Sequence, residues 1–449
     1  MMALHALFLL RLVDAACMVL TLLAAGSLLP SGLSVFADYA GATICTLLCY
    51  PLWFYILDAY RAGREDFRDT TGRMAVACVL GCISSSTAAY VLDCTPFSKI
   101  MLVMTAVGTA ILCLGWRYLY YRTSLRWGRP GRILLLGEDR DGVVRELLAE
   151  GLSRSVIVGF VGEERGGSAS LSRLGAPSET LLVAREQDVS LIVVLPDTPL
   201  DDALAGELLA AKLAGIQVVD IRLLCEHMAQ RLPLSQLDAS WLLLNEGFSL
   251  NTRGSLRRLK RVMDVLCALL LLAAAAPVML LAALAIALES PGPVIYCQRR
   301  VGLHEEPFTL YKFRSMREDA EMAGQPVWAA RDDVRVTRCG AFLRATRMDE
   351  LPQIWNVLAG DMSFIGPRPE RPQFVRALKK SIPFYGLRHS VKPGLTGWAQ
   401  VCYPYGASEE DARRKLEYDL YYIKNMSALL DIRIALRTLG VVLFPRGVR

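Results

Sequence analysis

Five long apolar stretches are the strongest constraint on how this chain folds. A helix needs about 20 consecutive apolar residues to cross the hydrocarbon core of a bilayer, because each residue adds only about 1.5 Å. Four stretches close to this length lie in the first quarter of the chain, at residues 7–29, 40–57, 74–91 and 101–121. We therefore predict four membrane-spanning helices there, followed by a fifth apolar segment that needs separate treatment.

The basic residues of the connecting loops indicate how these helices are oriented. The loops at residues 30–38 and 93–100 contain a single basic residue, Lys99. The other loop and the segment after the fourth stretch are rich in arginine: Arg61, Arg64, Arg68, Arg73, Arg122, Arg126, Arg129 and Arg132. Because Lys and Arg favour the cytoplasmic side, both ends of the bundle are predicted to face the cytoplasm. Arg11 and Asp14 interrupt the first stretch early, which argues against a cleaved signal peptide.

Composition supports a mixture of membrane and cytoplasmic parts. Hydrophobic residues make up 53% of the chain and charged residues 21%. The chain is therefore too apolar for an ordinary soluble protein and too charged to consist of membrane helices throughout. These values exclude a disordered chain and a collagen-like repeat. The net charge of +6, from 50 Lys and Arg against 44 Asp and Glu, gives no reason to expect nucleic acid as a partner. A membrane surface or a phosphate-rich substrate explains local basic clusters better.

Residues 129–225 are predicted to form a Rossmann-like α/β domain after a bundle at residues 1–128. Short β-branched runs alternate with helical stretches, which is typical of a parallel sheet. The runs lie at residues 133–137, 156–162, 191–196 and 216–221. The first turn, from Gly137 to Gly142, lacks the middle glycine of a dinucleotide-binding GxGxxG, and an acidic pair occupies that place. A bound NAD is not expected, and a structural or regulatory module is the preferred interpretation.

The fifth apolar stretch follows a linker predicted at residues 226–258. It covers residues 265–288, with Pro277 at its centre and basic residues on both flanks. A proline inside a helix removes a backbone hydrogen bond and kinks the helix. Basic flanks on both sides favour a segment that enters and leaves on the cytoplasmic face, whereas an ordinary kinked span would carry the following domain to the other side. The re-entrant segment, residues 262–289, is the preferred alternative.

Residues 259–449 form the predicted C-terminal domain, whose loops are rich in glycine and proline. Basic residues recur beside these loops: Arg299, Arg300, Lys312, Arg314, Arg335, Arg347, Arg368 and Lys392. A single such residue is usually a solvated surface charge. Eight of them interleaved with Gly-Pro loops indicate polyanion binding, because guanidinium groups donate two hydrogen bonds at once to phosphate oxygens.

Two adjacent carboxylates, Asp349 and Glu350, stand in the segment RMDELPQ between apolar residues and a proline. One such carboxylate can attack phosphorus while its neighbour holds a hard divalent cation. Spacing alone leaves the alternative open, since an Asp-Glu dipeptide is most often a helix start or a solvated face.

From residue 260 onward the chain resembles the bacterial sugar transferase family, the monotopic phosphoglycosyl transferases that start exopolysaccharide and O-antigen assembly. The matching segments, in chain order, are KRVMDV, QRRVG, YKFRSM, RVTRCGAFLRATRMDELPQIWNVLAGDMSFIGPRPE, VKPGLTGWAQV and KLEYDLYYIKN. So many matching segments, in the same order over one region, make the resemblance specific. The four spans and the degenerate Rossmann-like module are similar to the large subclass of this family, so the resemblance extends, more weakly, over the whole chain.

The resemblance implies a reaction and a set of residues. A hexose 1-phosphate passes from a UDP-sugar to undecaprenyl phosphate, UMP leaves, and an aspartyl phosphosugar forms on Asp349, whose partner Glu350 helps to hold Mg²⁺. Both carboxylates are therefore expected at the metal. Pro277 corresponds to the kink of the family's re-entrant hairpin. The residues expected to bind phosphate or nucleotide are Lys312, Arg314, Arg347, Arg368, Arg300 and Lys392.

The expected architecture is thus a multi-domain membrane protein. A four-helix transmembrane bundle precedes the Rossmann-like α/β module, and a re-entrant membrane helix hairpin leads into a mixed α/β, mostly helical, catalytic domain. We expect the bacterial inner membrane, the catalytic domain on its cytoplasmic face, and a homodimer. The final stretch, residues 427–444, is predicted to be an amphipathic helix that lies on the bilayer or packs on the domain.

Two other functions compete with the transferase. A membrane-anchored nucleotide-sugar dehydratase or epimerase requires an intact glycine fingerprint and a Tyr-x-x-x-Lys pair, and this sequence has neither. A catalytically silent scaffold or sugar-nucleotide sensor of polysaccharide assembly could tolerate loss of the Asp-Glu pair and of the basic loops, yet all are present. The sensor or dimerisation role is retained only for residues 132–224.

Overall fold

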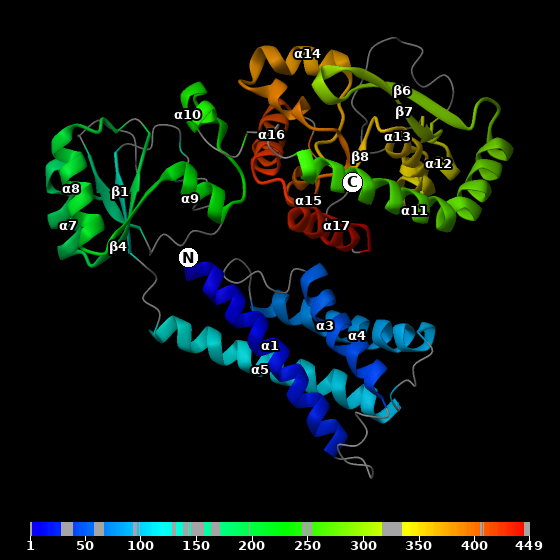
Figure 1. The fold of residues 1–449 in the computed structure, drawn as a ribbon, viewed down its shortest axis with the longest axis horizontal. Coiled ribbons are helices and arrows are strands. Elements are labelled where there is room, and N and C mark those ends of the chain that lie inside the picture. Colours follow the sequence, from blue (N-terminus) through cyan, green and yellow to red (C-terminus); the bar gives the residue numbers. More distant parts are fainter. Residues whose placement is uncertain are drawn as a thin grey trace. The chain divides into compact units, whose positions relative to one another are not determined.

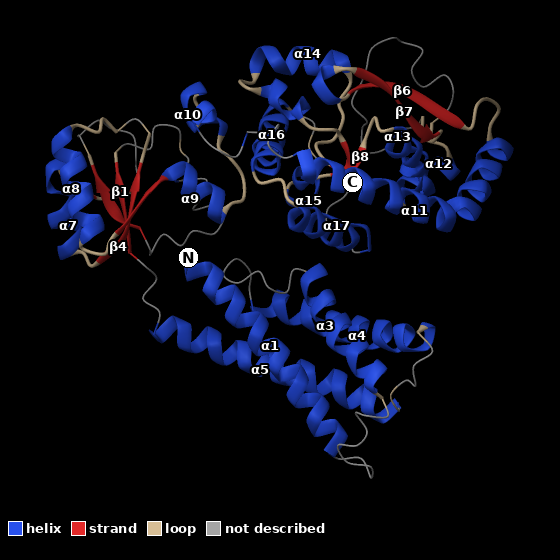
Figure 2. Ribbon diagram, viewed as in Figure 1, coloured by secondary structure: helices blue, strands red, loops and turns tan. Residues whose placement is uncertain are grey.

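The chain forms two compact units, Met1–Ile221 and Arg222–Arg449, in the computed structural model (Figure 1). The structure describes residues 2–27, 39–57, 67–92, 97, 99–127, 132–137, 142, 144, 157–162, 171–196, 198–244, 248, 254–316, 335–404, 406 and 408–443. Figure 2 shows the strands of the first unit gathered in one sheet and the second unit built mostly of helices.

The first unit begins with four helices at the places where membrane spans are predicted. They are α1 (Met2–Ser27), α3 (Ala40–Ile56), α4 (Phe67–Val91) and α5 (Lys99–Trp127). Among the described residues, three helices are long and apolar enough to cross a membrane, at Thr71–Val91, Ile100–Leu119 and Arg257–Glu289. The apolar parts of α1 and α3 are shorter, at Leu12–Ser27 and Ala40–Ile56. The chain is therefore a membrane protein by helix length and composition, and four complete spans remain a prediction.

Polar side chains between these helices are paired with one another. Arg117 of α5 forms a buried ion pair with Asp14 of α1, and the hydroxyl oxygens of Thr21 and Thr109 are 3.0 Å apart in the same interface. Burying an unpaired charge away from water would be costly, so the two charges must be buried together. The interruption of the first apolar stretch at Asp14 is thus explained by its partner on α5.

The predicted parallel α/β sheet is confirmed. Its strands are β1 (Arg132–Leu136), β2 (Ile157–Val161), β3 (Arg173–Gly175), β4 (Val189–Val194) and β5 (Gln217–Asp220). They are all parallel in the order β3-β2-β1-β4-β5. Helices α7 (Thr180–Glu186) and α8 (Asp202–Leu213) bury apolar side chains against it. In the turn after β1, residues 138–141 lie outside the described residues.

The second unit combines short strands with many helices. Its first half contains α9 (Ile221–Met228, which starts at the unit boundary), η4 (Leu234–Gln236), α10 (Ala239–Leu244), α11 (Gly254–Glu289), β6 (Ile295–Val301), η7 (Leu303–Glu305) and β7 (Pro307–Phe313). Its second half contains α12 (Arg338–Ala345), η9 (Met348–Gln353), α13 (Ile354–Ala359), β8 (Ser363–Ile365), α14 (Pro372–Ser381), η10 (Tyr385–Ser390), β9 (Gly394–Thr396), α15 (Trp398–Cys402), α16 (Glu409–Lys424) and α17 (Ala428–Leu443). Strands β6 and β7 pair antiparallel, and β8 pairs with β9 in parallel.

Residues from the segment predicted as a linker contribute to the core of this unit. Leu232, Leu234 and Leu237 are buried together with Trp398 and side chains of α16. Within this core, the guanidinium of Arg231 donates to Glu417 at 2.6 Å, and both side chains are buried. The segment before α11 is therefore folded onto the C-terminal part of the chain.

Helix α11 runs continuously through Pro277 instead of dividing into the two separate helices expected of a hairpin. Figure 1 shows the ribbon of α11 bending on the way to its C-terminal end, as expected for a proline inside a helix. Large leucines of this helix are not covered by the protein, among them Leu270, Leu280 and Leu288, which are 73%, 72% and 79% exposed.

Both halves of α11 pack on the same domain. Ala268, in the first half, is buried against Ile354 and Val357, whereas Ile286, near the other end, is buried against Phe313 and Leu343. The polar contacts follow the same division. Arg261 donates to the carbonyl oxygens of Val357 and Leu358, and the Glu289 carboxylate accepts from the backbone N–H of Cys339. Each end of the apolar helix is therefore tied to one and the same body.

The last helix, α17, packs on the domain, which is one of the two alternatives predicted for it. Leu430 and Ile434 are buried in the core, whereas Leu429 and Ile432 are exposed on the opposite face. The Asp431 carboxylate accepts from Lys260 of α11 at 2.6 Å, which joins the two helices. One face of α17 thus packs on the domain and the other is apolar and uncovered.

The buried pair between Arg231 and Glu417 gives a stability prediction. Arg231→Met should lower stability by about 3–5 kcal/mol, because the Glu417 carboxylate would stay buried without its cation. The measurement is the melting temperature of the detergent-solubilised full chain. Arg413→Met is the control, because Arg413 forms an ion pair with Glu410, which is 66% exposed. Equal melting temperatures for the two variants would contradict the prediction, and Glu417→Leu added to Arg231→Met should recover much of the loss.

Candidate active site

The two adjacent carboxylates lie on a short 3-10 helix, η9, that a left-handed residue introduces. Arg347 has φ 60°, which ends the turn after α12 and starts η9 in a new direction. Asp349 then points inward and is 8% exposed, and Pro352 stiffens the same turn. Solvated carboxylates at a helix start would be exposed, so the burial of Asp349 argues against that alternative.

Glu350 is held between two cations. Its Oε1 accepts from Nζ of Lys312 at 3.1 Å and from Nη2 of Arg368 at 2.7 Å. Burial by itself would raise the pKa of Glu350, but Arg368 and Lys312 outweigh burial and hold the pKa well below its ordinary value. The carboxylate is therefore ionised at neutral pH and binds both cations.

Asp349 shows the opposite shift. Burial raises the pKa of this carboxyl above its ordinary value, Lys312 opposes that effect, and the neighbouring charge of Glu350 adds to it. Two carboxylates that adjoin in sequence thus differ in their environments: one is clamped by cations and the other is desolvated. Carboxyl groups whose pKa values are pushed apart in this way are typical of sites where they have different chemical tasks.

The two cations reach Glu350 from separate parts of the fold. Lys312 lies on β7, opposite Tyr296 of β6. A fully buried amide, Asn356, fixes β7 against η9 and α13, since its Oδ1 accepts from the N–H of Tyr311 and its Nδ2 donates to the carbonyl of Thr309. Asn356 thereby sets the position of Lys312 on the strand.

Arg368 lies in a loop that a second Gly-Pro loop holds from behind. The N–H of Gly366 donates to the carbonyl of Thr396 at 2.9 Å, and the N–H of Gly394 donates to that of Pro367 at 2.9 Å. A side chain on Gly366 would collide with the backbone carbonyl of Lys392. Glycine is required there because the two backbones approach too closely for a Cβ atom.

Two buried residues that sequence reasoning did not assign to the site support this loop. Arg388 donates to the carbonyl of Arg368 at 3.0 Å and to the hydroxyl of Tyr385 at 2.6 Å, and it forms an ion pair with Asp419 at 2.9 Å. Burial raises the pKa of Asp419 to about 6, against the opposing effect of Arg388. The only sequence signal was an acidic residue among tyrosines in KLEYDLYYIKN, which does not reveal a partner 31 residues away.

The other predicted phosphate-binding residues fall into two groups. Near the dyad, Arg347 is exposed and influences both carboxylates, and Arg300 of β6 donates to the carbonyl of Pro369 at 3.0 Å. Farther away, the buried Arg314 donates to the carbonyl oxygens of Ser290 and Pro291 at the end of α11, and Lys392 lies beside Arg261. The structure thus brings Lys312, Arg368, Arg300 and Arg347 toward the dyad and directs Arg314 and Lys392 to either end of α11.

The donor set at the dyad suits a particular kind of metal ion. Among the described residues, no group of three or more His, Cys, Asp or Glu side chains is placed to hold a cation. Mg²⁺ often takes only one or two protein carboxylates and completes its shell with water and substrate phosphates. Asp349 and Glu350 fit that mode of binding. Two carboxylates do not fit a structural zinc site, which takes four protein ligands.

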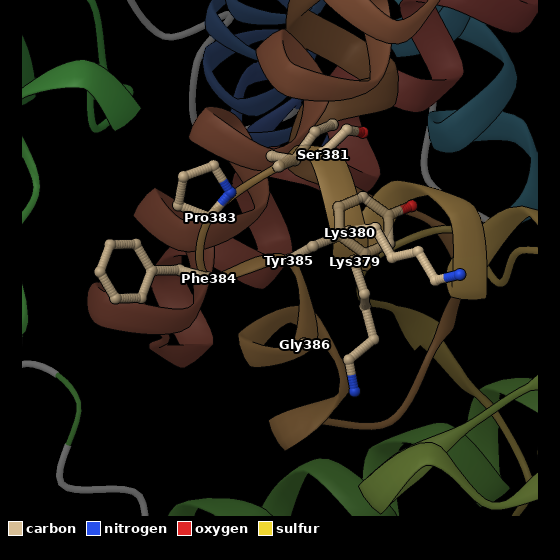
Figure 3. A pocket seen from close by; sticks show the side chains of 8 residues that line it. Lys379, Lys380, Ser381, Pro383, Phe384, Tyr385 and Gly386 are labelled. Carbon is tan, nitrogen blue, oxygen red and sulfur yellow. The ribbon is translucent and has the colours of Figure 1, made fainter.

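A cavity of about 350 Å³ lies away from these carboxylates, in the turn between α14 and η10. Figure 3 shows that its side chains come from one continuous stretch of chain, from Lys379 to Gly386. Lys379 forms an ion pair with Glu305 at 2.7 Å, and neither member of the Asp349–Glu350 dyad lines this cavity. It therefore adds nothing to the chemistry of the dyad.

Comparison with known proteins identifies the class to which this fold and site belong. The family model for bacterial sugar transferases matches residues 255–445. A UDP-glucose:undecaprenyl-phosphate glucose-1-phosphate transferase of Caulobacter vibrioides is 48% identical over 188 residues, which are 41% of this chain and 69% of that protein. The chain belongs to the bacterial sugar transferase family.

Two other relatives match over different shares of their length. A UDP-N-acetylgalactosamine-undecaprenyl-phosphate N-acetylgalactosaminephosphotransferase of Aeromonas hydrophila is 44% identical over 253 residues, 56% of this chain and 58% of that protein. A UDP-glucose:undecaprenyl-phosphate glucose-1-phosphate transferase of Xanthomonas campestris pv. campestris is 44% identical over 187 residues, 40% of this chain and 39% of that protein. The matches to these two relatives thus span 58% and 39% of their lengths.

The opposite pKa shifts of the dyad predict opposite effects of two amide substitutions on stability. Asp349→Asn removes a charge that burial disfavours, so the melting temperature at pH 7 should stay equal or rise. Glu350→Gln leaves Lys312 and Arg368 without their anion, which should cost about 1–3 kcal/mol. Melting of the full chain in detergent with EDTA measures both effects.

The pH dependence follows from the signs of the two shifts. A raised folded pKa means that ionised Asp349 destabilises the fold, so any advantage of Asp349→Asn should vanish as the pH falls below the ordinary pKa of aspartate. A lowered folded pKa means that Glu350 stabilises the fold above the ordinary pKa of glutamate and less below it. Equal losses in both variants at every pH would contradict this description of the site.

Proposed function

We propose that this protein transfers a hexose 1-phosphate from a UDP-sugar to undecaprenyl phosphate and releases UMP. The observation that carries the proposal is the pair formed by a buried, desolvated Asp349 and a Glu350 clamped by Lys312 and Arg368. The printed names of three relatives, all transferases that act on undecaprenyl phosphate, support the same reaction. The reaction would be the initiating step of exopolysaccharide, O-antigen or capsule synthesis.

The first half of the reaction forms a covalent intermediate on Asp349. A carboxylate oxygen attacks the phosphorus that bears the sugar, the bond from that phosphorus to the bridging oxygen breaks, and UMP leaves with that oxygen. The product is an aspartyl phosphosugar. Desolvation of Asp349 favours this step, since a carboxylate that has lost its water shell is the stronger nucleophile.

The second half returns the enzyme to its starting state. A phosphate oxygen of undecaprenyl phosphate attacks the same phosphorus, the bond to the Asp349 oxygen breaks, and the lipid carries a sugar diphosphate. No electrons are transferred and no proton is consumed between the two halves. Both displacements thus occur at the same phosphorus, one after the other. This is the ping-pong order that the resemblance implies.

The cations of the site stabilise the phosphate oxygens during both steps. Phosphoryl transfer depends mainly on positioning and on charge stabilisation. Lys312 and Arg368 supply positive charge beside Asp349, and Glu350 fixes where both cations stand. Mg²⁺, when bound by Asp349 and Glu350, would neutralise further negative charge on the substrate phosphates.

The proposal also includes a re-entrant anchor. Helix α11 exposes leucines, yet both of its ends contact the same domain through Arg261 and Glu289. A helix that crossed the bilayer would place these ends on opposite sides. We therefore infer that α11 enters and leaves one leaflet of the inner membrane, with the catalytic domain on the cytoplasmic face where UDP-sugars and the lipid phosphate meet. The protein is proposed to act as a homodimer.

The reaction predicts a defined pattern of UMP release. Wild-type protein in nanodiscs should release UMP from one member of a panel containing UDP-glucose, UDP-galactose and UDP-N-acetylgalactosamine, in a reaction that requires Mg²⁺. Without undecaprenyl phosphate, release should stop near one UMP per active site, with the phosphosugar on the peptide that contains Asp349. Asp349→Asn should lose about 10³-fold or more of the rate.

Glu410→Gln is the matched control, because Glu410 is an exposed carboxylate on α16. Its rate should equal that of the wild type. Folded wild-type protein that releases UMP from none of the sugars would overturn the proposal and favour the scaffold or sensor function.

The anchor predicts that both flanks of α11 are accessible from the same side. Cys297, on β6 after the helix, is exposed. All other cysteines are replaced by serine, so that one protein keeps only Cys297, and the other carries Arg258→Cys with Cys297→Ser, which places its single thiol before the helix. A membrane-impermeant maleimide should label both proteins in inverted vesicles and neither in spheroplasts. Labelling of the two thiols from opposite sides would show a crossing helix and would rule out re-entry.

A further inference from the structure

A second cavity lies beside β6, on the side of the strand that faces α14. Its volume is about 560 Å³, and it is lined by part of β6 and by the first turn of α14. Small-molecule sites in proteins commonly enclose about 300–1,000 Å³. The cavity is therefore large enough for a mononucleotide.

The charge of this cavity is suited to phosphate. Arg299, Arg371 and Arg376 line it, and its lining residues, all within the described part of the chain, include no carboxylate. Planar guanidinium groups donate two parallel hydrogen bonds to phosphate oxygens. The start of α14 at Pro372 adds the electropositive end of a ten-residue helix.

An aromatic ring completes the lining. Tyr296 is half-buried in the cavity wall, and its hydroxyl accepts from Nε2 of Gln298 at 3.1 Å. Gln298 accepts in turn from Arg300 at 2.6 Å, so the ring is anchored through two successive hydrogen bonds. A fixed aromatic ring beside cationic groups is a suitable surface for a nucleobase to stack on.

The β6–β7 pair links the cavity to the dyad. Tyr296 lies directly opposite Lys312 in the β6–β7 pair, and Lys312 donates to Glu350. Arg300 stands between the two regions. Burial lowers the pKa of Arg300 to about 10 despite the nearby Glu370 carboxylate, and the charges of Arg368 and Arg371 contribute to the decrease. The guanidinium groups thus form a basic path from Glu350 to the cavity.

We propose that this cavity binds the nucleoside and its attached phosphate from the sugar donor, with the base on Tyr296 and the phosphates along Arg299, Arg371 and Arg376. This inference rests on the proposed transferase function and adds the place where the leaving nucleotide is held. Helix α14 contacts β6, whereas α11 packs against α12 and α13 (Figure 1).

Direct binding tests the site without turnover. UMP is titrated into the full-length Asp349→Asn protein in detergent, and further changes are made in that background. Arg299→Gln and Arg376→Gln should each weaken UMP binding about tenfold, since each removes a charge-assisted contact with phosphate. Tyr296→Leu should weaken it about tenfold, and Tyr296→Phe should retain most of the binding because the ring remains. Arg413→Gln, an equal loss of charge elsewhere on the surface, should change nothing.

Inorganic phosphate serves as the second probe. It should bind far more weakly than UMP and should be insensitive to Tyr296→Leu. If phosphate competed with UMP on equal terms and Tyr296→Leu had no effect, the cavity would be a phosphate site only and the nucleoside assignment would be wrong. UMP affinity unchanged in both arginine variants would overturn the whole proposal.

Steady-state kinetics with the UDP-sugar distinguish a failure of this inference from a failure of the proposed function. In the wild-type background, Arg299→Gln and Arg376→Gln should raise the KM for the UDP-sugar about tenfold with a smaller change in kcat. If the wild type turns over and both variants keep its KM, the transferase proposal is retained and the cavity is not the nucleotide site. Absence of wild-type turnover together with UMP binding that the variants weaken would reject the transferase and retain a nucleotide site.

Discussion

The geometry of the site depends on one electrostatic interaction, the placement of the Glu350 carboxylate between Lys312 and Arg368. Two cations brought this close would repel each other strongly if no anion stood between them. Glu350 removes that obstacle and thereby allows positive charge to collect beside Asp349. The strand that carries Lys312 and the loop that carries Arg368 are in turn fixed by buried groups, Asn356 and Arg388. The fold of the second unit can be understood as the support of this arrangement.

How much of this could be predicted from the sequence depended on the range of the interactions. Apolar length predicted the N-terminal helices, and β-branched runs predicted the parallel sheet, because both signals are local. The importance of Asp349 and Glu350 came from a family resemblance and not from their spacing. Arg314 and Arg368 illustrate the remainder. Both are arginines beside Gly-Pro loops, yet one binds backbone carbonyls at the end of α11 and the other binds Glu350. Only the fold separates them.

Residues without a local signal were missed for the same reason. Arg388 and Asp419 are both buried, and each makes the burial of the other tolerable. Their pairing joins η10 to α16 across a long separation in sequence, which no periodic pattern records. The segment before α11 presents a similar case. Its leucines resemble those of a connecting segment, yet the fold buries them in the core, where Arg231 pairs with Glu417.

The attachment of both ends of α11 to a single domain has a mechanical consequence. Helices that span a membrane respond to a thicker or thinner bilayer by tilting. Helix α11 is held near its start by Arg261 and at its end by Glu289, so it cannot tilt without moving the catalytic domain with it. Helix α11 and the Asp349–Glu350 dyad therefore belong to one rigid part. The distance from the dyad to α11 therefore stays constant when the bilayer changes in thickness.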